Sequence, residues 1–317
     1  MTQHTTASAY AIDATATRQH PAGLAVLGAG PLELTVARVD DLTPRIRRFE
    51  LRSPRGVPLP PWTPGAHIAI PVLLASGEDT RCYSLHGDCD DRSVYEIAVL
   101  RHDDGRGGSQ AIHQTYHAGT HIRCEPPSNY FELDASGAPQ ILIAGGIGIT
   151  PLRSMATYLA KRGTAFSLHY AARSPLETAF LHDLEDRFGA HTRFWHSQKP
   201  HSHRIDVDII LSVAPSNARI YVCGPNSLVQ AVIDAGERYG LPRENIRYEL
   251  FSPAAADVKT HAFDVVLARS GRTCHVPENQ SILDTVLKAG VAAKFGCRAG
   301  RCGACAVTVL AGEVDHR

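Results

Sequence analysis

The sequence has no long apolar run, little sulfur and no excess of charge of either sign. No run approaches the ~18 apolar residues that span a bilayer, and 32 basic and 32 acidic side chains give a formal net charge of +0. We therefore expect neither a membrane span nor nucleic acid as a partner. Eight cysteines are too few for a disulfide scaffold. Residues 1–31, rich in Ala and Thr, lack the pattern of a signal peptide, so we expect a disordered tail on a cytoplasmic protein.

Short β-rich runs fill residues 32–134. Two of them, residues 34–39 and 46–51, alternate or nearly alternate between apolar and polar side chains, and Pro/Gly turns separate such runs. Repeated short strands joined by turns are typical of an antiparallel β-barrel. The sequence therefore predicts a barrel domain over residues 32–134.

Strands and helices alternate over residues 135–250. Residues 140–144 form a near-continuous apolar run, as a buried parallel strand requires. Thr150 is predicted to cap the helix that follows, with Pro151 in its first position and Gly163 at its end. Further strands are predicted at residues 166–170 and 219–222. This pattern indicates an α/β nucleotide-binding domain.

A Pro/Ala-rich linker at residues 251–260 precedes a third domain over residues 261–317. Residues 263–267 and 273–276 are predicted to form a hairpin. Ser281 and Asp284 resemble a capping box that opens a helix. The buried face of this helix is predicted to consist of Ile282, Leu283, Val286 and Leu287.

The most specific chemical signal lies in this third domain. The segment C-R-A-G-R-C-G-A-C places Cys297, Cys302 and Cys305 in the C-x4-C-x2-C spacing of plant-type [2Fe–2S] proteins. The small residues between them let backbone N–H groups approach the cluster sulfurs. A zinc site and buried structural thiols are the alternatives, but zinc fingers favour paired C-x2-C knuckles. The flanking pattern is β-grasp-like, and we predict a [2Fe–2S] ferredoxin domain.

The plant-type pattern also requires a fourth cysteine, roughly thirty residues downstream. The sequence ends at Arg317, and Cys274 lies upstream in a predicted strand. We therefore expect the ferredoxin domain to be incomplete and this chain not to hold a stable cluster. Intact mass, measured with iron and acid-labile sulfide per flavin, tests that expectation.

Two motifs in the first domain point to a flavin. In R-C-Y-S, Arg81 can bind phosphate, Tyr83 can stack on an isoalloxazine and Ser84 can hydrogen-bond its N5 edge. Downstream, G-R-G-G-S precedes a predicted helix, and a Gly-rich turn at a helix N-terminus cradles phosphate. Its residues of interest are Gly107, Gly108 and Ser109. Each motif alone is also compatible with an ordinary strand or a surface turn.

Two motifs in the second domain point to a dinucleotide. G-G-I-G-I-T-P follows a strand and opens a helix, where glycines admit a pyrophosphate to the helix N-terminus. C-G-P ends a later strand, and its cysteine is either a neighbour of a nicotinamide ring or a buried small hydrophobe. The candidate residues are Gly145, Gly146, Gly148, Thr150, Cys223, Gly224 and Pro225. Arg173 and Ser174 follow a strand and can bind a 2′-phosphate.

The order of these motifs resembles the phthalate dioxygenase reductase family, and especially the vanillate demethylase-type reductase components of Rieske oxygenases, over about residues 32–317. The resemblance implies FMN as the flavin, NADH as the donor and a C-terminal [2Fe–2S] domain. It implies that Arg81, Tyr83 and Ser84 line the flavin and that Gly107, Gly108 and Ser109 hold its phosphate. It places Gly146, Gly148 and Thr150 at the NADH phosphates, and Glu249 and Phe251 at the flavin–nicotinamide face.

The expected activity is electron transfer from NADH through FMN and the cluster to a Rieske-type terminal oxygenase component by a monomeric protein. A flavin accepts two electrons and releases them singly, so it must stand between hydride and cluster. Ser84, Cys223 and Glu249 are the residues expected to act at the reacting rings. Two alternatives remain: a reductase for another monooxygenase, and an NADH:flavin diaphorase or redox-sensing module that lacks a cluster.

Overall fold

The structure is a computed structural model. It describes residues 26–105, 107–198, 204–251, 261–293, 305 and 307–313. In this part of the chain, no helix is both long and apolar enough to cross a bilayer.

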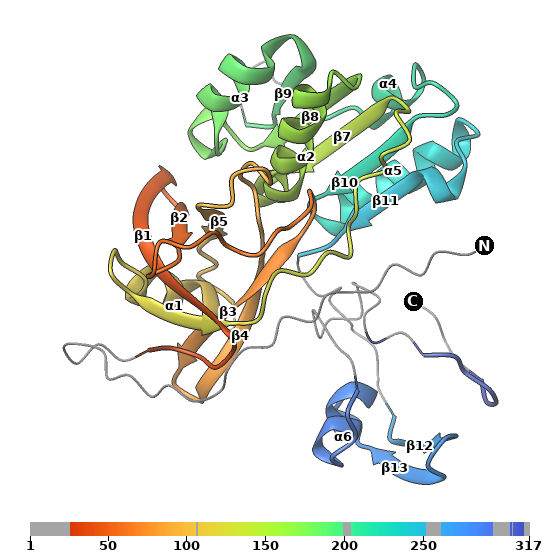
Figure 1. The fold of residues 1–317 in the computed structure, drawn as a ribbon. Helices are drawn as coiled ribbons and strands as arrows, with labels where there is room; N and C mark the ends of the chain where they lie inside the picture. Colours follow the sequence, from red (N-terminus) through yellow and green to blue (C-terminus); the bar gives the residue numbers. More distant parts are fainter. Residues whose placement is uncertain are drawn as a thin grey trace, which may run out of the picture.

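The first part of the chain is an antiparallel β structure with one helix (Figure 1). Four strands form one sheet in the order β5-β2-β1-β6, and β3 and β4 form a hairpin. The bounds are β1 Leu32–Thr43, β2 Ile46–Arg52, β3 His67–Leu74, β4 Gly77–Ser84, β5 Tyr95–Leu100, α1 Gly108–Thr115 and β6 His121–Cys124. The strands predicted at residues 34–39 and 46–51 are therefore confirmed within β1 and β2.

The hairpin packs across both edges of the four-stranded sheet. An antiparallel bridge joins His67 to Ser128, just beyond β6, and another joins Leu85, just beyond β4, to Ile97 of β5. Alternating side chains of these strands enclose one apolar core that includes Leu34, Phe49, Ile68 and Ile97. This packing fixes the end of β4, where the R-C-Y-S motif lies.

The second part is a five-stranded parallel sheet in the order β11-β10-β7-β8-β9. Helices α2 and α3 pack on one face and α4 and α5 on the other (Figure 1). The bounds are β7 Gln140–Gly145, α2 Ile149–Arg162, β8 Phe166–Ala172, α3 Leu181–Phe188, β9 Thr192–His196, α4 Val207–Leu211, β10 Arg219–Cys223, α5 Asn226–Arg238 and β11 Ile246–Glu249. The strands predicted at residues 140–144, 166–170 and 219–222 are confirmed.

The start of α2 differs from the prediction. A 3-10 turn over Gly146–Gly148 runs directly into the helix, so Gly148 is the N-cap residue and the helix begins at Ile149. The hydroxyl of Thr150 donates to the Ile147 carbonyl at 3.0 Å and does not cap the helix. Pro151 accordingly lies two residues inside the helix. The predicted end at Gly163, in the left-handed region with φ 64°, is confirmed.

The third part contains the hairpin β12 Phe263–Leu267 and β13 Arg272–Val276, followed by α6 Ile282–Lys288. The predicted cap is confirmed, because Ser281 accepts a hydrogen bond from the Asp284 backbone N–H at 3.0 Å. The predicted apolar face is wrong in part: Val286 is buried, whereas Ile282 is 43% exposed.

One apolar cluster is shared by the first two parts. Ile46 and Ala98 of the antiparallel sheet belong to the same buried cluster as Leu142, Leu152 and Tyr170 of the α/β part. The two sheets therefore meet through a packed core rather than through loops alone, which keeps the ends of their strands in fixed relation.

Candidate functional site

The predicted nicotinamide residues lie at the carboxyl ends of the parallel strands. Strand order reverses direction between β7 and β10, because β8 and β9 extend the sheet on one side and β11 on the other. In open α/β sheets, ligands bind at such a switch point. The turn after β7 and the C-G-P motif after β10 both lie there.

These glycines are needed for close backbone approach. A methyl group on Gly148 would collide with the Cys223 carbonyl, and one on Gly145 would lie 2.7 Å from the Pro225 ring. Gly146 has φ +56° and open space where a side chain would point. The turn is therefore packed tightly against C-G-P on one side and open on the other, which fits a pyrophosphate lying against the backbone.

Three residues predicted to act at the reacting rings come together. The Ser84 hydroxyl, at the end of β4, donates to the Glu249 carboxylate at 3.4 Å across the junction of the two sheets. Glu249 pairs in register with Cys223 on the neighbouring strand. Residues from three strands, far apart in sequence, thus converge at one edge.

The Cys223 side chain is fully buried. Burial, reinforced by the negative charge of Glu249, raises the pKa of the Cys223 thiol well above its ordinary value. A buried thiol that keeps its proton is a poor nucleophile.

The two predicted flavin motifs also meet. Arg81 lies so close to the start of α1 that a methyl group on Gly108 would come within 2.5 Å of its Nε. Gly107 has φ 78°, in the left-handed region that glycine adopts readily. The Arg81 guanidinium also contacts Asp79 at 2.5 Å. A positive group beside a glycine-rich helix start fits the phosphate of FMN.

Other predicted flavin residues have ordinary partners. Tyr83 is half-buried, and burial raises the pKa of its hydroxyl. Ser109 accepts a hydrogen bond from the His102 backbone N–H at 3.0 Å. Tyr83 and Arg81 lie on the same face of β4, because side chains two residues apart share a face.

The remaining predicted residues are more separated. Arg173 is exposed and Ser174 half-exposed directly after β8, at the same sheet edge as the glycine turn. Phe251 is 41% exposed beyond β11. Of the predicted cluster ligands, Cys305 is half-buried, whereas Cys297 and Cys302 lie outside the described residues.

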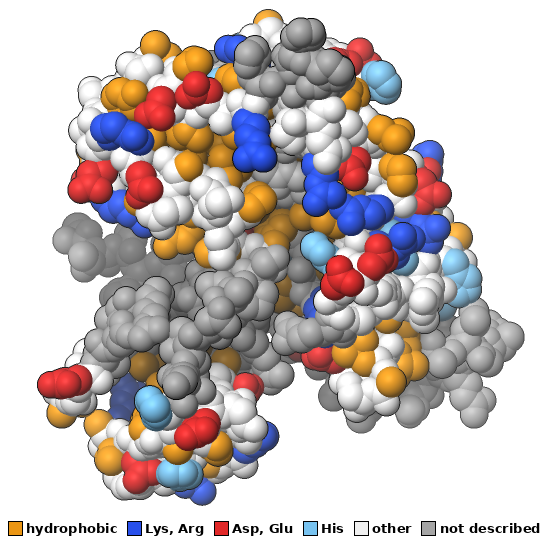
Figure 2. All heavy atoms as spheres, turned by 180° about the vertical axis from the view of Figure 1, so that it is seen from behind, with side chains coloured by type: hydrophobic (Ala, Val, Ile, Leu, Met, Phe, Trp, Pro, Cys, Tyr) orange, Lys and Arg blue, Asp and Glu red, His pale blue; other side chains and the backbone are white. Residues whose placement is uncertain are grey.

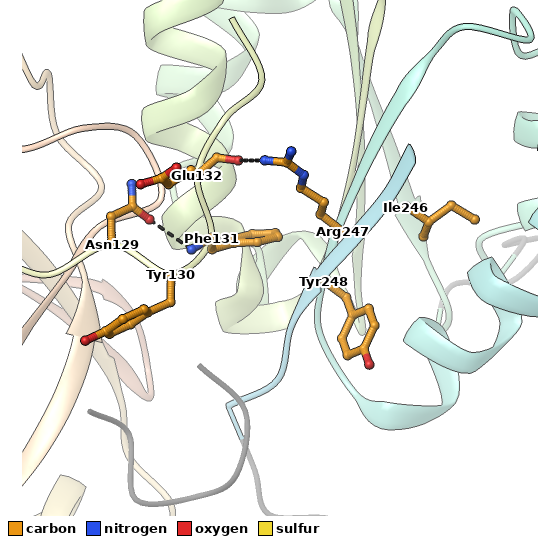
Figure 3. A pocket seen from close by; sticks show the side chains of 7 residues that line it. All are labelled: Asn129, Tyr130, Phe131, Glu132, Ile246, Arg247 and Tyr248. Atoms are coloured by element: carbon orange, nitrogen blue, oxygen red, sulfur yellow. Dashed lines mark hydrogen bonds between the residues drawn. The ribbon is translucent and has the colours of Figure 1, made fainter. Parts of the chain in front are cut away.

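A cavity of about 420 Å³ lies where the segment after β6 meets β11 (Figure 3). Arg247 of β11 donates to the Glu132 carbonyl at 2.7 Å and closes one side of it. Asn129 accepts from the Phe131 backbone N–H at 2.9 Å. Tyr248, which precedes Glu249 in β11, lines this cavity, whereas the glycine turn does not.

The surface around the junction carries charges of both signs. Hydrophobic side chains line a recess near the centre of the face in Figure 2, and basic and acidic side chains are interspersed around it.

Two residues of the junction were not predicted from the sequence. Arg153 and His86 are both buried and contact each other between the two sheets. One signal was available for Arg153: it lies four residues after Ile149 and three before Ala156, so a charge falls on the buried face of the helix.

The fold and the site together define a nicotinamide-dependent oxidoreductase with an iron–sulfur domain. Residues 142–234 match the oxidoreductase NAD-binding domain family, and residues 265–317 match the 2Fe-2S iron-sulfur cluster binding domain family.

Comparison with known proteins gives the family. The chain is 35% identical to vanillate O-demethylase oxidoreductase of Acinetobacter baylyi, over 90% of this chain and 89% of that protein. It is 34% identical to phthalate dioxygenase reductase of Burkholderia cepacia, over 91% and 89% of the two chains. The chain belongs to the phthalate dioxygenase reductase family, and it combines an NAD-binding domain with a 2Fe-2S cluster binding domain.

Solved structures agree. A structure of phthalate dioxygenase reductase, described as modular for electron transfer from pyridine nucleotides to [2Fe–2S], has a TM-score of 0.71 and 34% identity over 90% of this chain and 88% of that chain. An intact type IV self-sufficient cytochrome P450 monooxygenase has a TM-score of 0.76 and 35% identity over 90% of this chain. This chain corresponds to 37% of that larger protein.

Proposed function

We propose that this chain is the reductase component of a Rieske-type oxygenase system, which takes hydride from NADH and delivers single electrons to the terminal oxygenase. The observation that carries the proposal is the convergence of Ser84, Glu249 and Cys223 where the two sheets meet. A flavin held by β4 and a nicotinamide held by the glycine turn would face each other there.

The proposed flavin site uses the end of β4 and the start of α1. Arg81, Gly107, Gly108 and Ser109 bind the phosphate of FMN, and Tyr83 packs against the isoalloxazine. The support is the close approach of Arg81 to Gly108. Phe251 covers the face of the isoalloxazine ring on the nicotinamide side. Its side chain lies just beyond β11 and is 41% exposed, which leaves it free to pack on a bound ring.

The proposed nicotinamide site uses the edge of the parallel sheet. Gly145, Gly146, Gly148 and Thr150 receive the pyrophosphate, and Gly224 and Pro225 form the opposite wall. Arg173 and Ser174 stand at the adenosine end, at the carboxyl end of the next strand. Cys297, Cys302 and Cys305 are the proposed ligands of the cluster.

The chain's own residues orient and exclude water rather than transfer protons. Bound FMN would supply the ability to take up two electrons as hydride and to release them singly. The Ser84 hydroxyl has one proton, which it donates weakly to Glu249 at 3.4 Å in this structure and which it would turn toward the flavin edge when FMN is bound. The protonated, buried thiol of Cys223 forms an apolar wall beside the nicotinamide. No general acid or base is required.

We further propose three compact domains at residues 32–134, 135–250 and 261–317. The bridges at both edges of the β3–β4 hairpin support a closed antiparallel barrel in the first. The hairpin followed by α6 supports a β-grasp ferredoxin domain in the third. We propose a cytoplasmic monomer.

The test of the function is reconstitution with a candidate oxygenase. NADH should bleach the flavin anaerobically, and the reduced protein should then reduce the Rieske centre of an oxygenase encoded beside it, followed by its absorbance and electron paramagnetic resonance signals. A redox sensor would show no steady-state reduction of ferricyanide by NADH, and that result would overturn the proposal.

A haem acceptor is the second candidate, because one structural relative is a cytochrome P450 monooxygenase. Reduction of a P450 but not of any Rieske oxygenase would favour it.

The donor preference is tested at Arg173. We expect a higher kcat/KM with NADH than with NADPH. If NADPH is preferred instead, Arg173→Ala should remove that preference, since a guanidinium at the end of β8 can bind a 2′-phosphate.

A further inference from the structure

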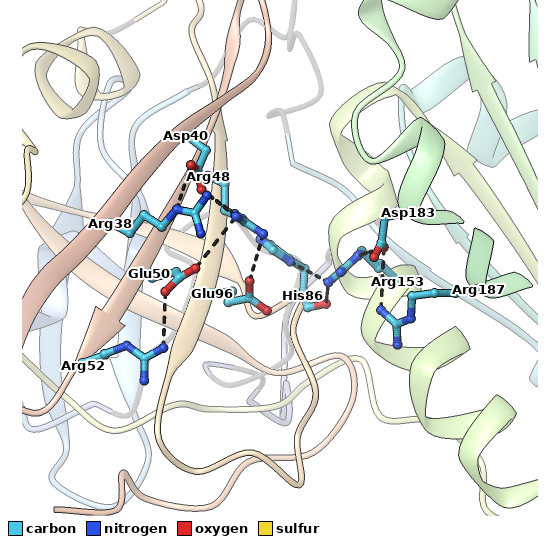
Figure 4. Close-up of polar contacts among 10 residues, drawn as sticks. All are labelled: Arg38, Asp40, Arg48, Glu50, Arg52, His86, Glu96, Arg153, Asp183 and Arg187. Carbon is cyan, nitrogen blue, oxygen red and sulfur yellow. Dashed lines mark hydrogen bonds and ion pairs between the residues drawn. The ribbon is translucent and has the colours of Figure 1, made fainter. Parts of the chain in front are cut away.

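A chain of polar contacts crosses the junction of the two sheets (Figure 4). On the side of the antiparallel sheet, Arg48 of β2 pairs with Asp40 at 2.6 Å and with Glu96 of β5 at 3.5 Å. On the side of the parallel sheet, Asp183 of α3 pairs with Arg153 of α2 at 2.9 Å. The two halves meet where Arg153 contacts His86, whose backbone N–H donates to the Glu96 carbonyl at 3.0 Å.

Arg153 binds the chain directly after β4. One guanidinium nitrogen donates to the His86 carbonyl at 2.8 Å and also to His86 Nδ1 at 3.1 Å. Burial, together with the positive charges of Arg153 and Arg48, holds the pKa of His86 well below its ordinary value. The imidazole is therefore neutral, and its Nδ1 can accept the hydrogen bond from Arg153.

Residues of the α/β part also hold the Arg153 side chain in place. Its Nε donates to Asp183, and its guanidinium lies 4.8 Å from the centre of the Phe180 ring. That ring also packs against His86, with 4.7 Å between ring centres. Phe180 has φ 63°, a left-handed conformation that is uncommon outside glycine, so the turn before α3 is shaped to present this ring.

The contact lies next to the proposed reacting edge on both sides. His86 follows Ser84 by two residues, and Leu85 between them is held by the Ala66 carbonyl at 2.8 Å. Arg153 lies five residues after Gly148, which packs against the Cys223 carbonyl. The hydrogen bond from the Arg153 guanidinium to the His86 carbonyl therefore connects the end of β4, at the proposed flavin site, to α2, which begins at the proposed nicotinamide site.

We propose that Arg153 is a positioning residue for hydride transfer: through the His86 carbonyl it fixes the distance between Ser84 and the glycine turn, and so between flavin and nicotinamide. The inference rests on the proposed function, because it concerns the same site. Arg153 touches neither ring in this arrangement and acts only through the chain segments that it joins. Reacting atoms displaced by about 1 Å can cost roughly 100-fold in rate.

The test compares Arg153→Met with Arg187→Met. Methionine keeps most of the side-chain volume of Arg153 but loses every hydrogen bond to His86 and Asp183. Arg187 is the matched control, because it pairs with the same Asp183 at 3.7 Å but, within the described part of the chain, hydrogen-bonds Thr157 of α2 on its own side of the junction.

In stopped-flow experiments with excess NADH, Arg153→Met should slow flavin reduction about 10- to 100-fold, with a larger primary isotope effect from 4-deuterated NADH. The Kd for FMN and the KM for NADH should change less than about threefold, since the binding residues are untouched. Arg187→Met should resemble the wild type in the rate of flavin reduction, the isotope effect, the Kd for FMN and the KM for NADH.

A second measurement does not depend on turnover. In the FMN-free protein, amide hydrogen exchange of residues 84–87 and 146–153 should accelerate in Arg153→Met and not in Arg187→Met. If Arg153→Met does not fold, Arg153→Lys serves instead. It keeps the charge beside Asp183 but cannot reach both partners at once, and it should show the same pattern with a smaller loss.

Wild-type rates of flavin reduction in a folded Arg153→Met or Arg153→Lys protein would overturn the inference. Equal slowing of both arginine variants, or a loss confined to FMN affinity, would also overturn it. Failure of the proposed function is distinct, because then NADH would not reduce the flavin of the wild type at all.

Discussion

At the scale of single residues, Ser84 and Arg81 share one strand but are expected to affect different quantities. Ser84→Ala should slow flavin reduction roughly 5- to 30-fold while FMN stays bound, because one hydrogen bond at the reacting edge is lost. Arg81→Ala should release FMN, because the phosphate loses its charged partner. Stopped-flow flavin bleaching and fluorescence titration with FMN measure the two effects.

The control for Ser84 is Ser93→Ala, a hydroxyl removed from the surface, where Ser93 accepts a bond from Arg52 at 3.2 Å. It should leave both quantities unchanged. An unchanged rate of bleaching in Ser84→Ala would contradict the role given to Ser84.

At the scale of elements, the turn between β7 and α2 depends on the absence of one side chain. Gly148→Ala should lower Tm by roughly 3–10 °C, because the new methyl group collides with the Cys223 carbonyl and overpacking costs about 1–3 kcal/mol. Gly189→Ala is the matched control, since a methyl group there meets nothing within 4 Å. Calorimetry gives the Tm of both variants. Equal Tm values would contradict the predicted collision at Gly148.

Strand β8 carries a histidine that makes stability depend on pH. Burial and the nearby charge of Arg193 lower the pKa of His169 to about 4. The unfolded chain binds this proton near pH 6.5, so stability is full above about pH 6.5 and falls as the pH drops toward 4.

The measurement is the free energy of unfolding in urea at pH 7.5 and pH 5. His169→Asn should reduce the difference between these two values. His182→Asn, whose side chain is 90% exposed, should not. An identical pH dependence in wild type and His169→Asn would show that folding does not lower the pKa of His169.

The helices and strands could be predicted from the sequence where a local pattern of apolar side chains determines the secondary structure. Alternation gave β1 and β2, and the apolar run gave β7, because each reflects burial along a single strand. The prediction that Thr150 caps α2 was wrong, because a 3-10 turn over Gly146–Gly148 runs directly into the helix. Gly148 packs against the Cys223 carbonyl, and local propensity does not encode such a distant contact. The contact of Arg153 with His86 spans 67 residues, and no local pattern contains such a pairing.

At the scale of the whole molecule, the shared core predicts joint unfolding of the first two parts. The sequence has two tryptophans. Trp62 is buried in the antiparallel part and Trp195 in the α/β part. In the single-tryptophan variants Trp195→Phe and Trp62→Phe, fluorescence should report the same unfolding midpoint in urea.

Ile46→Ala should then reduce the free energy of unfolding by about 2–5 kcal/mol. Both urea midpoints should fall together, because Ile46 belongs to the shared cluster. Two separate transitions, or a shift confined to the Trp62 signal, would contradict a common core.

The same shared core limits how such proteins can be recombined in evolution. A crossover in residues 125–139 would separate Ile46 and Ala98 from the helices that cover them and leave apolar surface in water. A crossover beyond β11 would leave the pair of sheets intact. We therefore expect gene fusions to transfer the two parts as one inherited block, with new electron acceptors joined outside it, as in the larger P450 chain of which this protein matches 37%.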